Sequence, residues 1–381
     1  MVKGRFLSCA FTTYIALATA LALFSAGPAL AVDADGDGLN DDVELTLGSN
    51  PAHKDIFIQV DWLVVNGRSM KPRDGLIAIL QNSFAVAPVS NPDGLPGITV
   101  HVELGNEIVD SREAIGYMDA GYNYDWNDFD AIKAAYLNPA HVNTHHYCLF
   151  AKCIGGQGGA PTTISGISRN NLTNFTAGAS DFIVALGADA WHNWPNSSLY
   201  YLIQSGTFMH ELGHDIGLRH GGVDHVNWKP NFLSVMNYTF QLWGVLNNKH
   251  SIYDYSRIQL PDLNEKKLNE TKGLGSNAAG YGTGWYYSKG HGSYVYHEVL
   301  DATKKIDWNV DRKIKSSVKA DISHDGAYCT LKGGYNEWAH IVFTGGAIGH
   351  TGMRASLPRV AGSGCLTFED VKRQSIPRQR L

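Results

Sequence analysis

The chain has 381 residues, of which 44% are hydrophobic and 18% are charged, a composition typical of a globular protein with one or two domains. Its 31 Lys and Arg residues are outnumbered by 36 Asp and Glu residues, so the formal net charge is −5. This balance argues against a protein that binds nucleic acid, which normally carries a basic excess. The 41 glycines, 9 tryptophans and 18 tyrosines exclude a coiled coil or a helical bundle rich in Ala, Glu and Lys, and they predict many turns.

The first 31 residues have the pattern of a signal peptide. Two positive charges are followed by an uncharged apolar run over residues 6–24, and the small residues Ala29 and Ala31 form a cleavage site. An uncleaved membrane anchor is the alternative, but acidic residues follow the run instead of a positive stop-transfer cluster. We therefore predict cleavage after Ala31, a secreted, extracellular protein, and no stable membrane anchor after cleavage.

Four cysteines remain after the predicted cleavage. An even number in an exported protein predicts two disulfides. Three connectivities are open, and we prefer the two pairs that each close a local loop. These pairs are Cys148–Cys153 and Cys329–Cys365.

Residues 33–44 fit the calcium-loop pattern D-x-D-x-D-G-x-x-D-x-x-E. Calcium binds about six to eight oxygens, and Gly38 permits the sharp turn that such a loop needs. A solvated acidic linker is the alternative interpretation. With the following residues 48–51, the stretch resembles one type three repeat of thrombospondin, which implies structural Ca²⁺ that holds the N-terminal loop (32–54) in place. The predicted oxygen ligands are the carboxylates of Asp33, Asp35, Asp37, Asp41 and Glu44 and the backbone carbonyl of Leu39.

The segment after this loop alternates between strand and helix patterns. This order predicts an α/β (α+β) fold with a twisted, largely parallel sheet over residues 55–254. Residues 255–381 are rich in Gly and aromatic residues without strong periodicity, and we interpret them as an irregular C-terminal subdomain or extension. Strands are predicted over 55–65, 97–104, 146–154 and 181–186, and helices over 73–87, 128–137 and 198–209.

The most informative segment is the string HELGHDIGLRH, which begins at His210. Residues four apart share a helix face, so His210 and His214 can present their imidazoles to one ion. Glu211 lies about 100° around the helix from His210, close enough to reach a metal-bound water. Gly217 can adopt a positive φ and end the helix, which brings His220 to the same ion. Three imidazoles leave one zinc position open, as in a catalytic site, whereas incidental helix histidines would not require Gly217 and His220 as well.

This string resembles the motif H-E-x-x-H-x-x-G-x-x-H of the metzincin clan of zinc endopeptidases. The Met-turn of that clan is matched by Ser234-Val-Met236-Asn-Tyr238. The resemblance implies that Met236 forms a hydrophobic floor beneath the zinc ligands. It also implies that Tyr238 ligates zinc in the resting state and then supports the transition state, as the tyrosine at this place does in astacins and serralysins. Without the upstream motif, both residues would be interpreted as ordinary core residues.

The connection between His220 and the Met-turn is short. Gly221 follows the third histidine, where the better-known subfamilies carry other residues, so no subfamily is assigned. Asp224 is interpreted either as an acceptor that orients a ligand histidine or, equally, as a surface carboxylate. His225 is interpreted as a surface residue, because catalytic zinc needs an open position. A glycosylation sequon begins at Asn237, where a glycan would collide with the zinc floor.

Two stretches of the C-terminal third, residues 307–313 and 321–326, match the calcium-loop pattern only in part. A second calcium site is therefore a minority interpretation. No large prosegment fits between the predicted cleavage site and the first strand, so we predict an enzyme without a conventional N-terminal prodomain.

These patterns predict a secreted zinc-dependent endopeptidase that acts on peptide or protein substrates, with Zn²⁺ and structural Ca²⁺ as cofactors. Glu211 would be the general base for a zinc-activated water, and Tyr238 would help to stabilise the oxyanion. One alternative is an exported calcium-binding matrix or adhesion protein with a vestigial metal site, which would be favoured if Glu211 or a ligand were replaced; none is. Another alternative is a zinc amide hydrolase that acts on non-peptide substrates.

Overall fold

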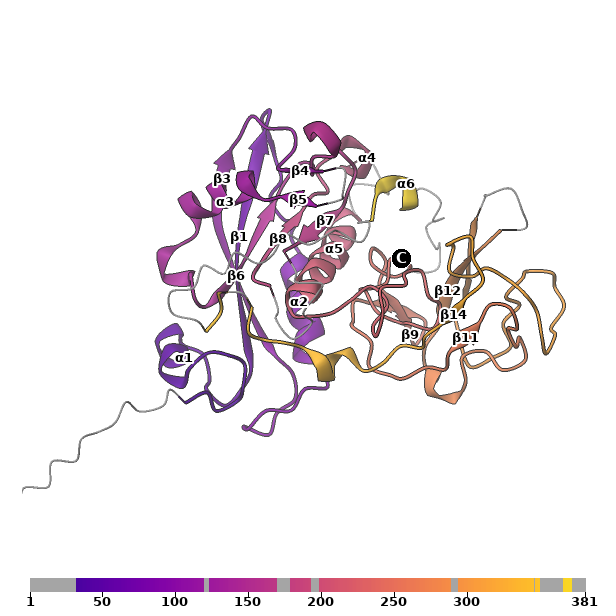
Figure 1. Ribbon diagram of the computed structural model, residues 1–381. Coiled ribbons are helices and arrows are strands. Elements are labelled where there is room, and N and C mark those ends of the chain that lie inside the picture. Colours follow the sequence, from indigo (N-terminus) through magenta and orange to yellow (C-terminus); the bar gives the residue numbers. More distant parts are fainter. Residues whose placement is uncertain are drawn as a thin grey trace, which may run out of the picture.

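The computed structural model describes residues 32–119, 123–169, 179–192, 199–288, 294–345, 347–349 and 366–371 (Figure 1). The predicted signal peptide and Cys365 lie outside the described residues. Within the described ranges, no helix is both long and apolar enough to span a membrane.

The strands are β1 (Asp55–Val65), β2 (Arg68–Ser69), β3 (Thr99–Val109), β4 (Tyr117–Met118), β5 (Tyr124–Asp125), β6 (His145–Phe150), β7 (Gly166–Ser168), β8 (Asp181–Val184), β9 (Val245–Asn247), β10 (His250–Ile252), β11 (Leu263–Asn264), β12 (Thr283–Tyr287), β13 (Val295–Val299) and β14 (Thr330–Leu331). The α-helices are α1 (Asp41–Leu47), α2 (Leu76–Ala85), α3 (Asn127–Tyr136), α4 (Asp189–His192), α5 (Tyr200–Asp215) and α6 (Phe368–Val371). Short 3₁₀ helices are η1 (Pro139–His141), η2 (Gln157–Gly159), η3 (Ser276–Ala278) and η4 (Glu337–His340).

The central sheet is mixed but mainly parallel. β1 lies between β3 and β6 and pairs in parallel with both, and β6 pairs in parallel with β8. β7 lies antiparallel to β8 at one edge, and β2 folds back antiparallel onto the end of β1. β1 is buried along almost its whole length, which explains its nearly continuous apolar sequence. The predicted α/β fold class with a largely parallel sheet is confirmed.

The two faces of the sheet have different neighbours. Successive strand residues point to opposite faces. α2 and α5 pack against each other and against the sheet, α2 on β3 and α5 on β7 and β8 (Figure 1). On the other face, Tyr147 of β6 packs edge-on against Phe129 of α3, with 5.5 Å between ring centroids. The helix that carries the zinc motif therefore lies on one face of the sheet, and α3 lies on the other.

Several elements differ from the prediction, mainly at their ends. The strand predicted over 97–104 continues to Val109, and the helix predicted over 198–209 continues as a single 16-residue helix to Asp215. The short strand β7 and the helix α1 were not predicted. Both are too short to show a clear hydrophobic period in the sequence.

The C-terminal third contains a second hydrophobic cluster. This cluster begins at Leu233, before the predicted start of the C-terminal subdomain. It includes Trp285 and Trp308, whose ring centroids are 5.2 Å apart. Further along the chain, Trp338 belongs to the main core, where its ring centroid lies 4.9 Å from that of Tyr255. The C-terminal third is thus anchored to the main core by residues on both sides of its own cluster.

The predicted Cys148–Cys153 disulfide is wrong, because both cysteines are free thiols. Cys365, the predicted partner of Cys329, lies outside the described residues, and Cys329 is a free thiol in the described structure. Cys148 lies inside β6, where each residue advances the chain by about 3.3 Å. The strand continues past Cys148 to Phe150, so the chain leads away from Cys148 before it reaches Cys153. Cys329 instead donates its thiol to the carboxylate of Glu265 at 3.4 Å.

Candidate metal centre

α5 carries the first two histidines of the motif, and the turn after it delivers the third. His210 and His214 lie one helical turn apart, and both are buried. α5 ends at Asp215, and Gly217 has a φ of 90°, in the left-handed region that glycine enters at little cost. The Gly217 amide donates to the carbonyl of His214 at 3.1 Å, so the chain reverses there and brings His220 to the other two histidines.

The three imidazoles converge on a common centre. Their Nε2 atoms lie 3.2 Å apart for His210 and His214, 2.9 Å for His214 and His220, and 3.2 Å for His220 and His210. A tetrahedral ion with bonds of about 2.0–2.1 Å would hold such nitrogens roughly 3.3 Å apart. The Nδ1 atoms of His210 and His214 donate to the carbonyls of Val235 and Leu218, each at 2.9 Å, which leaves their Nε2 lone pairs facing the centre.

Burial also favours the neutral form of these histidines, which is the form that binds a metal. It lowers the pKa of His214 to about 4, and it lowers the pKa values of His210 and His220 well below their usual range. The donor set, the spacing and the protonation state of the three residues therefore all fit zinc.

The Met-turn lies directly against this cluster. Met236 is fully buried, and a Cβ on Gly213 of α5 would lie only 2.3 Å from its Sδ. The missing side chain at Gly213 thus lets the helix approach the Met-turn closely. Val235, the neighbour of Met236, accepts the hydrogen bond that orients His210. Asn237 donates to two buried backbone carbonyls at 2.7 and 2.9 Å, so its amide is engaged inside the protein and is not accessible to glycosylation.

Tyr238 lies beside the histidines. Its ring centroid is 4.6 Å from that of His220 and 5.5 Å from that of His210. Its backbone amide donates to the side chain of Asn227 at 2.8 Å. The Tyr238 ring thus packs against two of the three histidines of the cluster.

Glu211 is 4% exposed, and burial, with Asp215 as a second cause, raises its pKa well above the usual range. Its side chain packs against the backbone of Gly166 in the edge strand β7, where a Cβ would lie 2.5 Å from Oε1. A carboxyl group with a raised pKa can both accept and return a proton near neutral pH. The contact with Gly166 could not be predicted, because β7 itself was not.

A second buried carboxylate, Asp215, lies at the end of α5. Ser168 of β7 donates its hydroxyl to Asp215 Oδ1 at 2.5 Å, and His146 Nδ1 lies 3.5 Å from Oδ2. Burial raises the pKa of Asp215 well above its usual range. Sequence reasoning missed these supporting residues, because Asp215 occupies a variable position of the motif and its partners lie far away along the chain.

Asp224 contacts a lysine instead of a ligand histidine. It accepts a hydrogen bond at 2.9 Å from Nζ of Lys229, a fully buried lysine that also donates to the carbonyl of Gly221 at 2.6 Å. This contact pins the loop that follows His220. His225 is exposed, as expected for a surface residue.

Acidic side chains gather at the N-terminus. Oxygens of Asp33, Asp35 and Asp37 lie within 4.8 Å of one another, and so do oxygens of Asp37, Glu44 and Asp55. Asp55 is the first residue of β1 and was not a predicted ligand. Both Glu44 oxygens, and one oxygen each of Asp35 and Asp55, are buried without a hydrogen-bond partner in the described structure. Burial raises the pKa of Asp37 to about 7 and that of Glu44 to about 8.

The other two predicted calcium ligands are placed differently. Asp41 lies outside these two groups of carboxylates, and its Oδ1 accepts from the amide of Ala34 at 2.9 Å. Leu39 packs its side chain with Phe57 and Ile348, and its amide donates to Asp37. The carboxylates at the centre of the loop fit a hard cation, because a bound ion would satisfy the orphaned oxygens.

The two stretches of the C-terminal third that partly match the calcium-loop pattern form turns in which carboxylates accept hydrogen bonds from nearby protein groups. The carboxylate of Asp307 accepts two backbone amides, and Lys315 pairs with Asp311. The carboxylates of residues 321–326 lie close to Glu265, whose oxygens accept backbone amides as well. None of these carboxylates has the orphaned oxygens of Glu44.

Comparison with known proteins gives a distant structural likeness. No protein family matches the chain, and no curated protein does. Among solved structures, archaemetzincin from Methanopyrus kandleri aligns with 48% of this chain and 81% of its own, at 14% sequence identity and a TM-score of 0.26. A likeness this weak does not bear on function, which has to be judged from the geometry of the site.

Proposed function

We propose that the protein is a zinc-dependent hydrolase and, more specifically, a secreted endopeptidase. The observation that carries this proposal is the convergence of three buried, neutral imidazoles beside a buried glutamate with a raised pKa. When bound, Zn²⁺ would act as a Lewis acid and lower the pKa of a water ligand to about 7. A vestigial site is disfavoured because every ligand and Glu211 are present and oriented.

The residues around the histidines have separate roles. Glu211 takes a proton from the attacking water and returns it to the leaving amine. The Tyr238 hydroxyl donates a hydrogen bond to the oxyanion that develops on the scissile carbonyl. The Val235 carbonyl orients His210, and Met236 packs against α5 at Gly213. Asp215 joins the end of α5 to β7 through Ser168.

The position of β7 favours a peptide substrate over a non-peptide amide. Among the strands of the described residues, β7 is the last in the order of the sheet, and Glu211 packs against it. The main-chain groups of an edge strand can pair with an extended peptide. Residues 366–367 of this chain already pair in this way with residues 164–165, just before β7.

Replacing Glu211 with Ala tests this function. The variant should keep its zinc, because the three histidines remain, and it should cleave casein about 10²- to 10⁴-fold more slowly because proton transfer is lost. Zinc content is measured by elemental analysis, and turnover is measured on casein, a peptide library and a set of non-peptide amides. The control is Glu298→Ala in β13, far from the histidines along the chain. Wild-type cleavage by the Glu211 variant would refute the assignment, and activity of the wild type on non-peptide amides alone would favour the alternative hydrolase.

We also propose that the N-terminal acidic loop binds Ca²⁺ through Asp33, Asp35, Asp37 and Glu44, with Asp55 as an added ligand. The buried, unpartnered oxygens of Glu44 support this proposal, because an orphaned buried carboxylate is costly unless a cation pairs with it. Asp55 would link the loop to the first strand of the sheet.

Export is proposed from the signal-peptide pattern of residues 1–31. The free cysteines are compatible with an oxidising environment. Burial raises the pKa of Cys148 well above its usual range and that of Cys153 to about 11, so neither thiol readily forms the reactive thiolate.

A further inference from the structure

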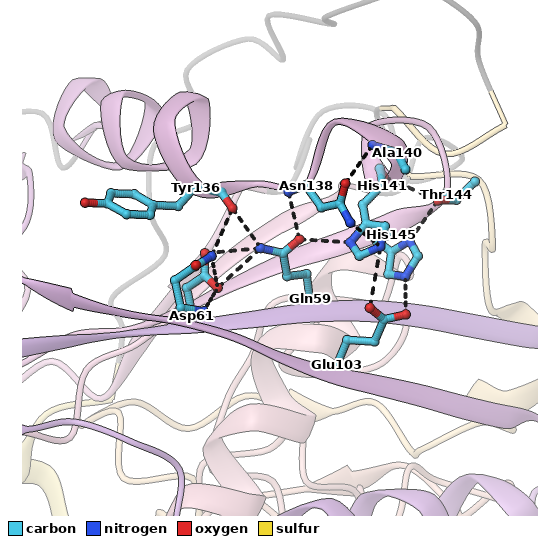
Figure 2. Close-up of polar contacts among 10 residues, drawn as sticks. Gln59, Asp61, Glu103, Tyr136, Asn138, Ala140, His141, Thr144 and His145 are labelled. Atoms are coloured by element: carbon cyan, nitrogen blue, oxygen red, sulfur yellow. Dashed lines mark hydrogen bonds and ion pairs between the residues drawn. The ribbon is translucent and has the colours of Figure 1, made fainter.

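A second cluster of metal-ligand side chains lies on the α3 face of the sheet, away from α5 (Figure 2). It consists of Glu103 in β3, His141 in η1 and His145 in β6. His145 Nε2 lies 3.3 Å from Glu103 Oε1, and His141 Nε2 lies 3.5 Å from Oε2. The two imidazoles are stacked, with 3.7 Å between ring centroids and 15° between planes. Both Nε2 atoms therefore point to the same carboxylate.

The other nitrogen of each ring is already engaged. His141 Nδ1 lies 2.9 Å from Gln59 Oε1, an oxygen that can only accept, so Nδ1 carries the proton. The Asn138 amide donates to His141 Nε2 at 3.3 Å, which agrees with a lone pair there. The Thr144 oxygen lies 2.7 Å from His145 Nδ1, and its hydroxyl donates to the carbonyl of His141 at 3.4 Å, an arrangement in which this oxygen can accept the proton of His145 Nδ1.

With both protons on Nδ1, the Nε2 lone pairs of the two histidines face the Glu103 carboxylate, and that of His141 also has the longer contact with the Asn138 amide. A neutral Nε2 and a carboxylate oxygen are both acceptors, and they repel each other unless a proton or a cation lies between them. Protons on both Nε2 atoms would place two like charges in rings stacked at 3.7 Å. A metal ion removes this conflict. Imidazoles whose Nδ1–H groups are bound to protein oxygens are typical of metal sites.

We propose that Glu103, His141 and His145 form a second transition-metal site that binds Zn²⁺ or a similar divalent ion. Two neutral imidazoles and one carboxylate are a ligand set that zinc accepts. The histidine side chains are at most 10% exposed and that of Glu103 is 52% exposed, so the ion enters from solvent beside Glu103. Because the ligands come from both neighbours of β1 and from η1, the bound ion ties β3 to β6 across β1.

The test counts metal ions in the full chain. The protein is stripped with a chelator, kept in excess Ca²⁺ to saturate the acidic loop, titrated with Zn²⁺ and analysed for bound zinc after gel filtration. The wild type should bind two equivalents. Glu103→Gln and His145→Ala should each bind one, and the double variant His210→Ala/His214→Ala should bind the other one. His250→Ala, which removes an exposed histidine of β10, should still bind two.

A milder variant, which keeps all three ligands, tests the site with less risk of misfolding. Thr144→Val removes the hydroxyl that orients His145 and should weaken the second site by about 10- to 100-fold, with an unchanged circular dichroism spectrum. Two equivalents with unchanged affinity in Glu103→Gln, or one equivalent in the wild type that is lost only with His210 and His214, would overturn the proposal. Zinc that is lost in Glu103→Gln but kept in the His210/His214 variant would support this site while refuting the proposed zinc hydrolase.

Discussion

Gly166 and Gly213 permit two close approaches that position the proposed catalytic carboxylate and the Met-turn. A Cβ on Gly166 would lie 2.5 Å from Glu211 Oε1, and a Cβ on Gly213 would lie 2.3 Å from Met236 Sδ. Separations below about 3 Å force one group to move. The rotamer of Glu211 therefore depends on a residue in β7 that contributes no functional group.

Gly166→Ala should lower turnover without removing zinc. The new methyl group would push the Glu211 carboxylate out of place, and a displacement of about 1 Å can cost about 10²-fold in rate. Turnover on casein and zinc content are the measurements.

The matched control is Gly67→Ala, in the turn between β1 and β2. Gly67 has a φ of 74°, and its Cβ would meet no atom, so this variant should lose stability but keep its turnover per folded molecule. Equal turnover in Gly166→Ala and the wild type would show that β7 does not position Glu211.

At the scale of elements, α5 combines two tasks in one helix. It carries His210, Glu211 and His214, and it packs on the sheet through buried residues along nearly its whole length. Because α5 packs tightly against the Met-turn, a shift of the helix would also displace the histidines of the candidate metal centre. Substitutions that would be harmless in a solvent-facing helix should therefore be costly here.

Gly213→Ala should destabilise the protein, although alanine is the better helix former. The gain in helix propensity is up to about 1 kcal/mol. Overpacking against Met236 costs about 1–3 kcal/mol, and this larger effect should win. The free energy of unfolding is measured with urea. In a double-mutant cycle, Gly213→Ala should cost less in the Met236→Ala background than in the wild type. A stabilised Gly213→Ala variant would contradict the close packing.

At the scale of the whole molecule, Asp55 connects the acidic loop to the sheet. It is the first residue of β1, and its carboxylate joins those of Asp37 and Glu44. An ion bound by these carboxylates would attach the N-terminal segment to β1, the strand that pairs in parallel with both β3 and β6.

Ca²⁺ should therefore stabilise the folded N-terminal segment. An ion that binds only the folded form contributes about 2.7 kcal/mol at a concentration 100 times its Kd. Proteolysis of residues 33–55 should be slow in Ca²⁺ and fast in a calcium chelator, as followed by mass spectrometry. Glu44→Gln should remove most of this calcium dependence, whereas Asp42→Asn, a helix residue outside the carboxylate groups, should leave it intact. Identical proteolysis with and without Ca²⁺ would show that the loop does not bind it.

The sequence by itself determined the features that follow from local chain geometry. β1 was predicted with its observed bounds because a continuous apolar run needs no distant partner to be recognised. The alignment of His210 with His214 follows from the period of the helix, and the return of the chain at Gly217 follows from the freedom of glycine at positive φ.

Only the tertiary structure decided which distant groups meet. The contact of Gly166 with Glu211, the addition of Asp55 to the acidic loop and the convergence of Glu103 with His145 all depend on strand pairing and register. Spacing along the chain sets distances only within a helix or a strand, whereas distances between elements are set by how their buried faces pack.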